Sequence, residues 1–188
     1  MNTITVTFDD GRRAEHPAGI TVGALLQSPA APDGLPYLAA MVNNDVCSFS
    51  YPLPFNCHVR FLTMSAPNGW RVYRRSLCFL LAKAVCDIHP QAVFSVEHSF
   101  GSGLYCSLQP PGAGTEGITS DQIRDLETHM RGLVLRNIPV ERRKISYTEA
   151  VEHFEKSGQV HKLNLLKYRN PPHVVTHWCD GFSDLAHG

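Results

Sequence analysis

The stretch from Trp70 to Pro90 constrains the fold of this chain more than any other part of the sequence. Apolar residues recur in it at helical spacing, which predicts a long helix with one face in a core. This apolar face comprises Leu77, Leu80, Leu81, Ala84, Val85 and Ile88. A second face mixes charged, aromatic and small side chains, namely Arg71, Arg75, Phe79, Ala82 and Cys86. What the second face contacts decides whether the chain carries a catalytic site.

Short strands and turns precede this helix. Residues 3–8 alternate apolar and polar, as in a half-buried strand, and Asp9-Asp10-Gly11 predicts a tight turn into a second strand at 12–16. Thr21 is a candidate N-cap for a short helix at 22–27, and further strands are predicted at 37–42, 46–49 and 58–64. A hairpin, one helix and then more strands is the order of a β-grasp (ubiquitin-like) fold. The turn-rich residues 65–69 predict a domain boundary, with domains at 1–66 and 67–188.

The second domain alternates helices and strands, so the chain as a whole is predicted to be α+β. Strands are predicted at 92–97, 104–108, 138–145 and 173–179, and a glycine-rich loop at 110–117. Thr119 with Gln122, and Ser146 with Glu149, are capping boxes that open helices extending to about 137 and 156. A shorter helix is expected at 159–166. The sequence ends a few residues past its last predicted strand, so we expect it to be truncated C-terminally.

Composition excludes several functional classes. Lys plus Arg equals Asp plus Glu, at 17 each, so no global field recruits nucleic acid or a membrane. Clusters at 71–75 and 142–144 are typical of solvated charges, although a local basic patch stays possible. The six cysteines form no Cys-x-x-Cys pair, no signal peptide opens the chain, and no apolar run approaches the ~20 residues of a membrane span. We expect a soluble, cytoplasmic protein with free, mostly buried cysteines and no membrane partner.

Motifs for the commonest chemistries are missing. The glycines at 101–107 (GSGLYCS) lack the lysine of a phosphate loop, and no G-x-S-x-G elbow occurs. His173 and His177 would lie ~13 Å apart on one strand face, too far for one zinc ion. His177 and Cys179 share a strand face, which leaves a metal site or a nucleophile–base pair open. A chance arrangement with an inert buried thiol is favoured, so we expect no metal ligand and no catalytic residue.

Several segments resemble known domains. ITVTFDDGRRAEHPAGITVGALL and VNNDVCSF resemble the TGS domain, the β-grasp module at the N-terminus of threonyl-tRNA synthetase. SLCFLLAKAVCDIHP, GLYCSL, ITSDQIRDLETHMRGLVLRNIPVERRKISYTEAVEHFEKSG and HKLNLL are similar to the adjoining second additional domain. In threonyl- and alanyl-tRNA synthetases that domain hydrolyses mischarged tRNA. The resemblance therefore implies a TGS-like domain at 1–66 followed by an editing-like domain at 67–188.

The resemblance also identifies a pocket that has lost its chemistry. The family pairs an H-x-x-x-H on the long helix with a C-x-x-x-H near the end of the domain. The matching positions here are Arg75 and Phe79, then Cys179 and Ser183. The family's lysine is retained as Lys162, and an acidic residue is replaced by His177. Because arginine neither ligates metals nor acts as a base near neutral pH, the hydrolytic site is expected to be disabled. With His98 and Tyr105 added, the predicted degenerate pocket comprises Arg75, Phe79, His98, Tyr105, Lys162, His177, Cys179 and Ser183.

The departures point to one branch. RRSLCFLLAKAVCDIHP, EHSFGSGLYC and HKLNLLKYR resemble the N-terminal region of bacterial uridine kinase-like (nucleoside kinase) proteins. This implies an accessory region that binds RNA or a small anionic ligand, or regulates a kinase domain downstream of Gly188. ATP and Mg²⁺ would belong to that transferase domain, with no cofactor in this chain. Two alternatives remain: an editing hydrolase rebuilt from His98, Lys162, His177 and Cys179, and a module that binds only proteins.

Overall fold

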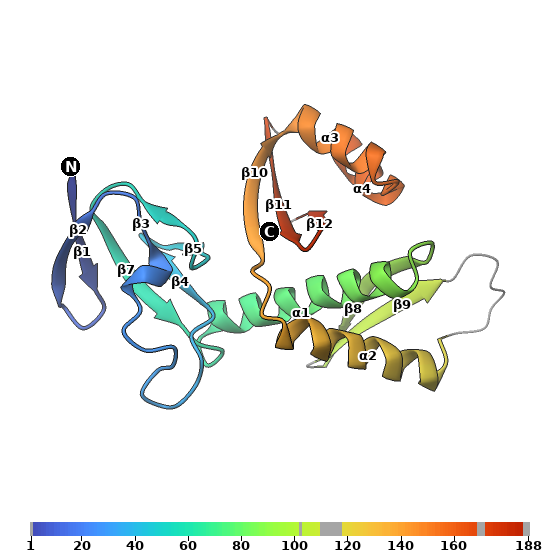
Figure 1. The fold of residues 1–188 in the computed structure, drawn as a ribbon, viewed down its shortest axis with the longest axis horizontal. Helices are drawn as coiled ribbons and strands as arrows, with labels where there is room; N and C mark the ends of the chain where they lie inside the picture. The colour runs from blue at the N-terminus through green and yellow to red at the C-terminus, as the bar shows by residue number, and fades with distance from the viewer. Residues whose placement is uncertain (1, 102, 110–117, 169–171, 186–188) are drawn as a thin grey trace. The chain divides into compact units, whose positions relative to one another are not determined.

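The computed structural model describes residues 2–101, 103–109, 118–168 and 172–185 (Figure 1). The chain is mixed α+β and divides into two compact units, Met1–Cys78 and Phe79–Gly188. The first helix, α1 (Pro67–Ile88), runs through the point of division. The predicted loop at 110–117 lies outside the described residues. Within the described part, no helix is both long and apolar enough to cross a membrane.

A five-stranded sheet of order β2-β1-β7-β4-β5 dominates the first unit. Strand β1 pairs parallel with β7, and the other neighbours pair antiparallel. The strands are β1 (Thr3–Phe8), β2 (Arg13–Pro17), β4 (Ala39–Val42), β5 (Asp45–Cys47) and β7 (Cys57–Leu62). The predicted alternation in β1 is confirmed, since Ile4, Val6 and Phe8 are all buried. Gly11 has a φ of 82°, as the predicted Asp-Gly turn requires.

The helix predicted at 22–27 is shorter than expected. Thr21 does cap it, by accepting a hydrogen bond from the Ala24 N–H, but the structure forms only a 3₁₀ turn, η1 (Val22–Leu25). The backbone is already extended at Leu26, and 3₁₀ segments are typically this short. Two further short strands, β3 (Ile20–Thr21) and β6 (Pro52–Leu53), pair with each other and were not predicted.

Helix α1 begins at Pro67, three residues before the predicted start, and its first turn depends on a glycine. A Cβ atom on Gly69 would lie 1.9 Å from the Thr63 carbonyl oxygen, so only glycine lets the helix pass the end of β7. The predicted apolar face holds for Ala84 and Val85, which are buried. It fails at Leu77, which is 40% exposed. Periodicity identifies a helix face but does not show how far along the helix that face is covered.

The second unit contains a helical pair packed on a hairpin (Figure 1). The hairpin pairs β8 (Val93–Phe100) with β9 (Gly103–Gln109), and α2 is Ser120–Leu135. Leu126 and Leu133 of α2 share a core with Ala84 and Val85 of α1. The capping box at Thr119 and Gln122 is confirmed, with both reciprocal hydrogen bonds formed.

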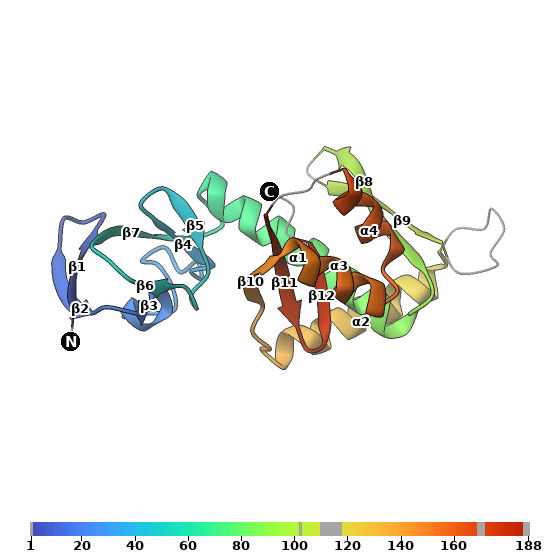
Figure 2. The ribbon, with the colours of Figure 1, turned by 90° about the horizontal axis from the view of Figure 1, so that it is seen from above.

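The remaining elements build a three-stranded sheet of order β10-β11-β12, with α3 lying against β10 and β11 (Figure 2). They are β10 (Glu141–Ser146), α3 (Tyr147–Lys156), α4 (Val160–Lys167), β11 (His173–Cys179) and β12 (Phe182–Leu185). The capping box at Ser146 and Glu149 is confirmed. Phe154 and Leu166 bury the two helices against Val174 of the sheet. Strand β12 was not predicted, although Asp180-Gly181 before it is a hairpin signal.

Candidate functional site

Aromatic rings fill the space beside the β11–β12 hairpin where Phe79 meets it. Phe79 is only 8% exposed, and its ring centroid lies 5.3 Å from that of Phe182 and 6.1 Å from that of His177. Phe182 stands opposite Cys179 in the register of the hairpin. Edge-to-face and tilted contacts at these distances stabilise aromatic clusters beyond simple burial. Phe79 therefore acts as a core residue, and its position holds no group that could ligate a metal or transfer a proton.

Lys162, the cation predicted to lie in the pocket, already has an acidic partner. Its ammonium forms an ion pair with the Asp184 carboxylate, and the two side chains are 21% and 13% exposed. Asp184 stands opposite His177 across β11 and β12. Because the charge of Lys162 is balanced within the protein, its attraction for a further anion is reduced.

Ser183 is the most deeply buried of the predicted residues, at 1% exposure. Its hydroxyl lies 2.5 Å from Nε2 of His153, a residue that was not predicted to belong to the site. The His153 ring also lies 4.5 Å from the ring of Trp178. Burial, together with the nearby Lys156 ammonium, holds the pKa of His153 below its usual value, so the imidazole is neutral near pH 7. A serine beside a neutral histidine suggests a nucleophile, but no substrate reaches a hydroxyl buried this deeply.

Cys179 is likewise buried, at 6% exposure. Burial raises the pKa of its thiol, and the Lys83 ammonium offsets only part of that effect. The thiolate, which is the nucleophilic form, is therefore scarce near neutral pH. Cys47 and Cys57 are also buried.

The other predicted residues lie elsewhere. His98 and Tyr105 face each other across the β8–β9 hairpin, with ring centroids 5.1 Å apart and planes 24° apart. Both are exposed, Tyr105 at 55%. Arg75 is an exposed residue of α1, one helical turn before Phe79. The structure thus gathers Phe79, His177, Cys179 and Ser183 around one hairpin with Lys162 beside it, and pairs His98 with Tyr105.

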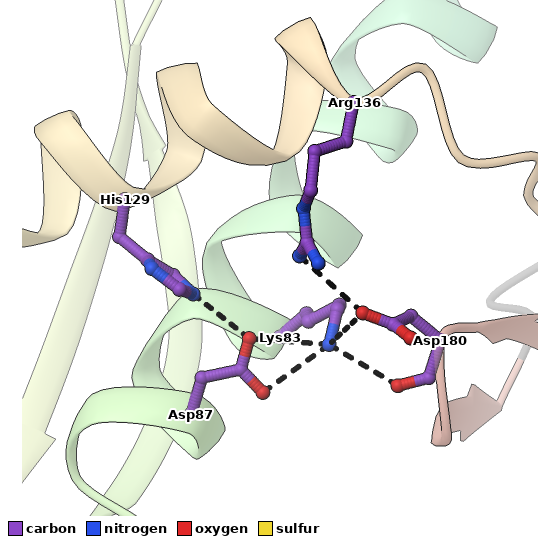
Figure 3. A network of polar contacts seen from close by, with 5 residues as sticks. All are labelled: Lys83, Asp87, His129, Arg136 and Asp180. Carbon is purple, nitrogen blue, oxygen red and sulfur yellow. Dashed lines mark hydrogen bonds and ion pairs between the residues drawn. The ribbon is translucent and has the colours of Figure 1, made fainter.

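A group of polar side chains that no sequence motif signals surrounds the buried Lys83 (Figure 3). The Lys83 side chain is 3% exposed, and its ammonium donates to the Asp87 carboxylate at 3.2 Å and to the Asp180 carbonyl at 3.4 Å. It also lies 3.9 Å from the Asp180 carboxylate. His129 and Arg136, both from α2 or its C-cap, complete the group by pairing with Asp87 at 2.8 Å and Asp180 at 3.3 Å.

These contacts join α1, α2 and the β11–β12 turn around the buried ammonium of Lys83. Burial alone would raise the pKa of Asp87, but hydrogen bonds from His129 and Lys83 outweigh it and hold that pKa below its usual value. Asp180 has a φ of 48° and begins the turn into β12, and both its carbonyl and its carboxylate point toward the Lys83 ammonium (Figure 3). We assign the Lys83 group a structural role, because Lys83, His129 and Arg136 each pair with a carboxylate of the protein. The spacing of Lys83 and Asp87 is the only part of it that a sequence could signal.

The arrangement beside the hairpin suits packing better than hydrolysis. Residues 2–101, 103–109, 118–168 and 172–185 contain no group of three or more His, Cys, Asp or Glu side chains that could hold a metal ion. The thiol and the hydroxyl are buried, and the lysine is paired.

No protein-family model matches the chain. Its similarity is to aminoacyl-tRNA synthetases, and in particular to threonine–tRNA ligases. The ligase of Desulforamulus reducens is 28% identical over 186 residues, that of Geobacter sp. strain M21 is 26% identical over 188, and that of Coxiella burnetii is 26% identical over 185. These alignments cover 98%, 100% and 98% of this chain. The chain spans less than a third of each relative, at 29%, 29% and 28% of its length.

Proposed function

We propose that the chain is an accessory, non-catalytic region composed of a TGS-like β-grasp domain, residues 1–66, and an editing-like domain, residues 67–188. The first assignment is supported by the strand order β2-β1-β7-β4-β5 with a parallel β1–β7 pair, since a β-grasp sheet places its first and last strands side by side in parallel. The second is supported by similarity to threonine–tRNA ligases along nearly the whole chain.

One observation carries the proposal that hydrolysis has been lost: the packing of Phe79 against Phe182 and His177. The family's editing helix carries a histidine at the position of Phe79. Here a buried ring occupies it and makes van der Waals contacts instead of holding water or a metal. The pairing of Lys162 with Asp184 supports the same conclusion.

The rebuilt-hydrolase alternative has less support. It needs His98, Lys162, His177 and Cys179 to act together. The nearest ring to His98 is that of Tyr105, and burial raises the pKa of the Cys179 thiol. The alternative that the region binds only proteins is compatible with the same packing, and it differs in predicting no small-molecule or RNA ligand.

The parent protein that we propose is a bacterial uridine kinase-like transferase. In it, this region would bind RNA or a small anion, or regulate the kinase domain, and ATP and Mg²⁺ would bind to that domain. The gene sequence after codon 188 tests this. We expect a G-x-x-x-x-G-K-[ST] phosphate loop in the same reading frame. Synthetase catalytic motifs there, or an immediate stop codon, would refute the kinase assignment.

A further inference from the structure

A cavity of about 500 Å³ lies in the first unit, and none of the residues of the predicted degenerate pocket lines it. Its wall combines most of residues 60–68, at the end of β7 and the start of α1, with Ala31 and Tyr37. The volume falls within the range of small-molecule sites, roughly 300 to 1,000 Å³. Among the described residues that line this wall, Arg60 is the only charged one, and none is a carboxylate that would repel an anion.

Two donors of the wall converge on a poor acceptor. Arg60 Nη2 lies 3.0 Å from the sulfur of Met41, and Asn68 Nδ2 lies 3.2 Å from the same sulfur. A thioether is a weak acceptor, whereas guanidinium groups bond most strongly to carboxylate and phosphate oxygens. The Asp9 carboxylate lies 3.7 Å from Nε of the guanidinium, and both side chains are half-exposed. The Nη2 atom of Arg60 and the Asn68 amide are thus held together on the Met41 sulfur, where an oxygen acceptor would bond more strongly.

The rest of the wall offers an apolar surface. Tyr37 and Phe61 lie with ring centroids 5.3 Å apart and planes inclined by 46°. Both line the cavity, and neither is fully buried. Ser65 adds a hydroxyl, 2.7 Å from that of Thr63. Aromatic faces beside a cation suit a ligand that carries a flat ring next to its negative group.

We propose that this cavity binds a small aromatic oxyanion, whose phosphate or carboxylate accepts hydrogen bonds from Arg60 and Asn68 in place of the Met41 sulfur. The ring of the ligand packs against Tyr37 and Phe61. This site goes beyond the proposed function and does not depend on it, because it lies wholly within residues 31–68 and uses none of the editing-like positions.

Titration of the whole chain, followed by amide chemical shifts, tests the proposal with three probes: phenyl phosphate, benzoate and inorganic phosphate. We expect saturable shifts at residues 60–69 with phenyl phosphate, with benzoate or with both, and weaker binding of inorganic phosphate because it lacks a ring. Whichever aromatic probe binds more tightly identifies the source of the oxyanion. Absence of saturable shifts with both aromatic probes would overturn the proposal. If inorganic phosphate bound as tightly as phenyl phosphate, the proposed packing of the ligand's ring against Tyr37 and Phe61 would be refuted.

Substitutions locate the site. Arg60→Gln should weaken binding about tenfold, which is the effect of losing a charge-assisted hydrogen bond. Because the Arg60 side chain is half-exposed, we expect this variant to fold normally. Met41→Leu should change the affinity by no more than about twofold, since the ligand replaces the Met41 sulfur as the hydrogen-bond acceptor. The matched control is Arg13→Gln, which removes an exposed arginine from β2 and should change nothing. Unchanged affinity in Arg60→Gln, or an equal loss in Arg13→Gln, would refute the site.

Discussion

The ring centroid of Phe79 lies 5.3 Å from that of Phe182, so α1 packs against the β11–β12 hairpin through an apolar contact. Phe79 is only 8% exposed, so this contact contributes to the stability of the second unit.

Phe79→Ala should lower the free energy of unfolding by about 3 kcal/mol, because it leaves a cavity where a ring was buried. Urea unfolding followed by circular dichroism measures the change. Phe100→Ala is the matched control, since Phe100 is 82% exposed and its loss should cost under about 0.5 kcal/mol. Equal effects of the two substitutions would show that Phe79 is not a core residue.

Lys83→Met should destabilise the protein by about 2 kcal/mol, because it leaves Asp87 and Asp180 without their shared buried cation. This is below the usual cost of breaking a fully buried pair, since both carboxylates are partly exposed. Lys156→Met, at an 81% exposed lysine with a 3.9 Å ion pair, should change stability by less than about 0.5 kcal/mol. Thermal unfolding of both variants compares the two, and a neutral Lys83→Met would refute the structural role.

His153 should make stability depend on pH. Its pKa is lower in the folded state than in the unfolded state, so folding favours the neutral imidazole. The stabilising contribution is complete above the unfolded pKa of about 6.5 and is lost as the pH falls through the folded pKa. His153→Gln should therefore lose less stability than the unsubstituted protein between about pH 7.5 and about pH 5.5. His161→Gln changes an exposed residue of α4, and this variant should lose as much stability over this pH range as the unsubstituted protein.

Thiol labelling should separate the cysteines by burial. Cys86 is exposed on α1 and should react with an aromatic disulfide reagent in the native protein, even though burial and Asp87 raise its pKa. Cys179 should react only on unfolding, because it is buried and burial raises its pKa as well. Mass spectrometry of the labelled peptides distinguishes the two. Rapid labelling of Cys179 in the native protein would contradict its burial and would support a role as a nucleophile.

Local signals in the sequence predicted local structure well. The two capping boxes formed as expected because each needs only a hydroxyl and a side chain three residues later. The Asp9-Asp10-Gly11 turn formed for a similar reason, since it depends on one residue with positive φ. Strands β3, β6 and β12 escaped prediction because strands of two to four residues show too little periodicity.

The site was less accessible to prediction because its contacts join distant residues. The family resemblance located Phe79, Cys179 and Ser183, but the partners Phe182 and His153 became visible only in three dimensions. Lys83 and Asp180 are 97 residues apart, and a lysine on a helix is normally solvent-exposed. Only the fold shows that Lys83 is buried and paired.

The rate at which the chain hydrolyses a mischarged threonine tRNA tests the central claim most directly. We predict that adding the protein leaves the half-life of the aminoacyl ester equal to that in buffer, because Phe79, Cys179 and Ser183 are buried and Lys162 is paired with Asp184. A functional threonine–tRNA ligase editing domain serves as the positive control. Enzyme-like turnover by this chain, abolished by Cys179→Ala, would contradict the account.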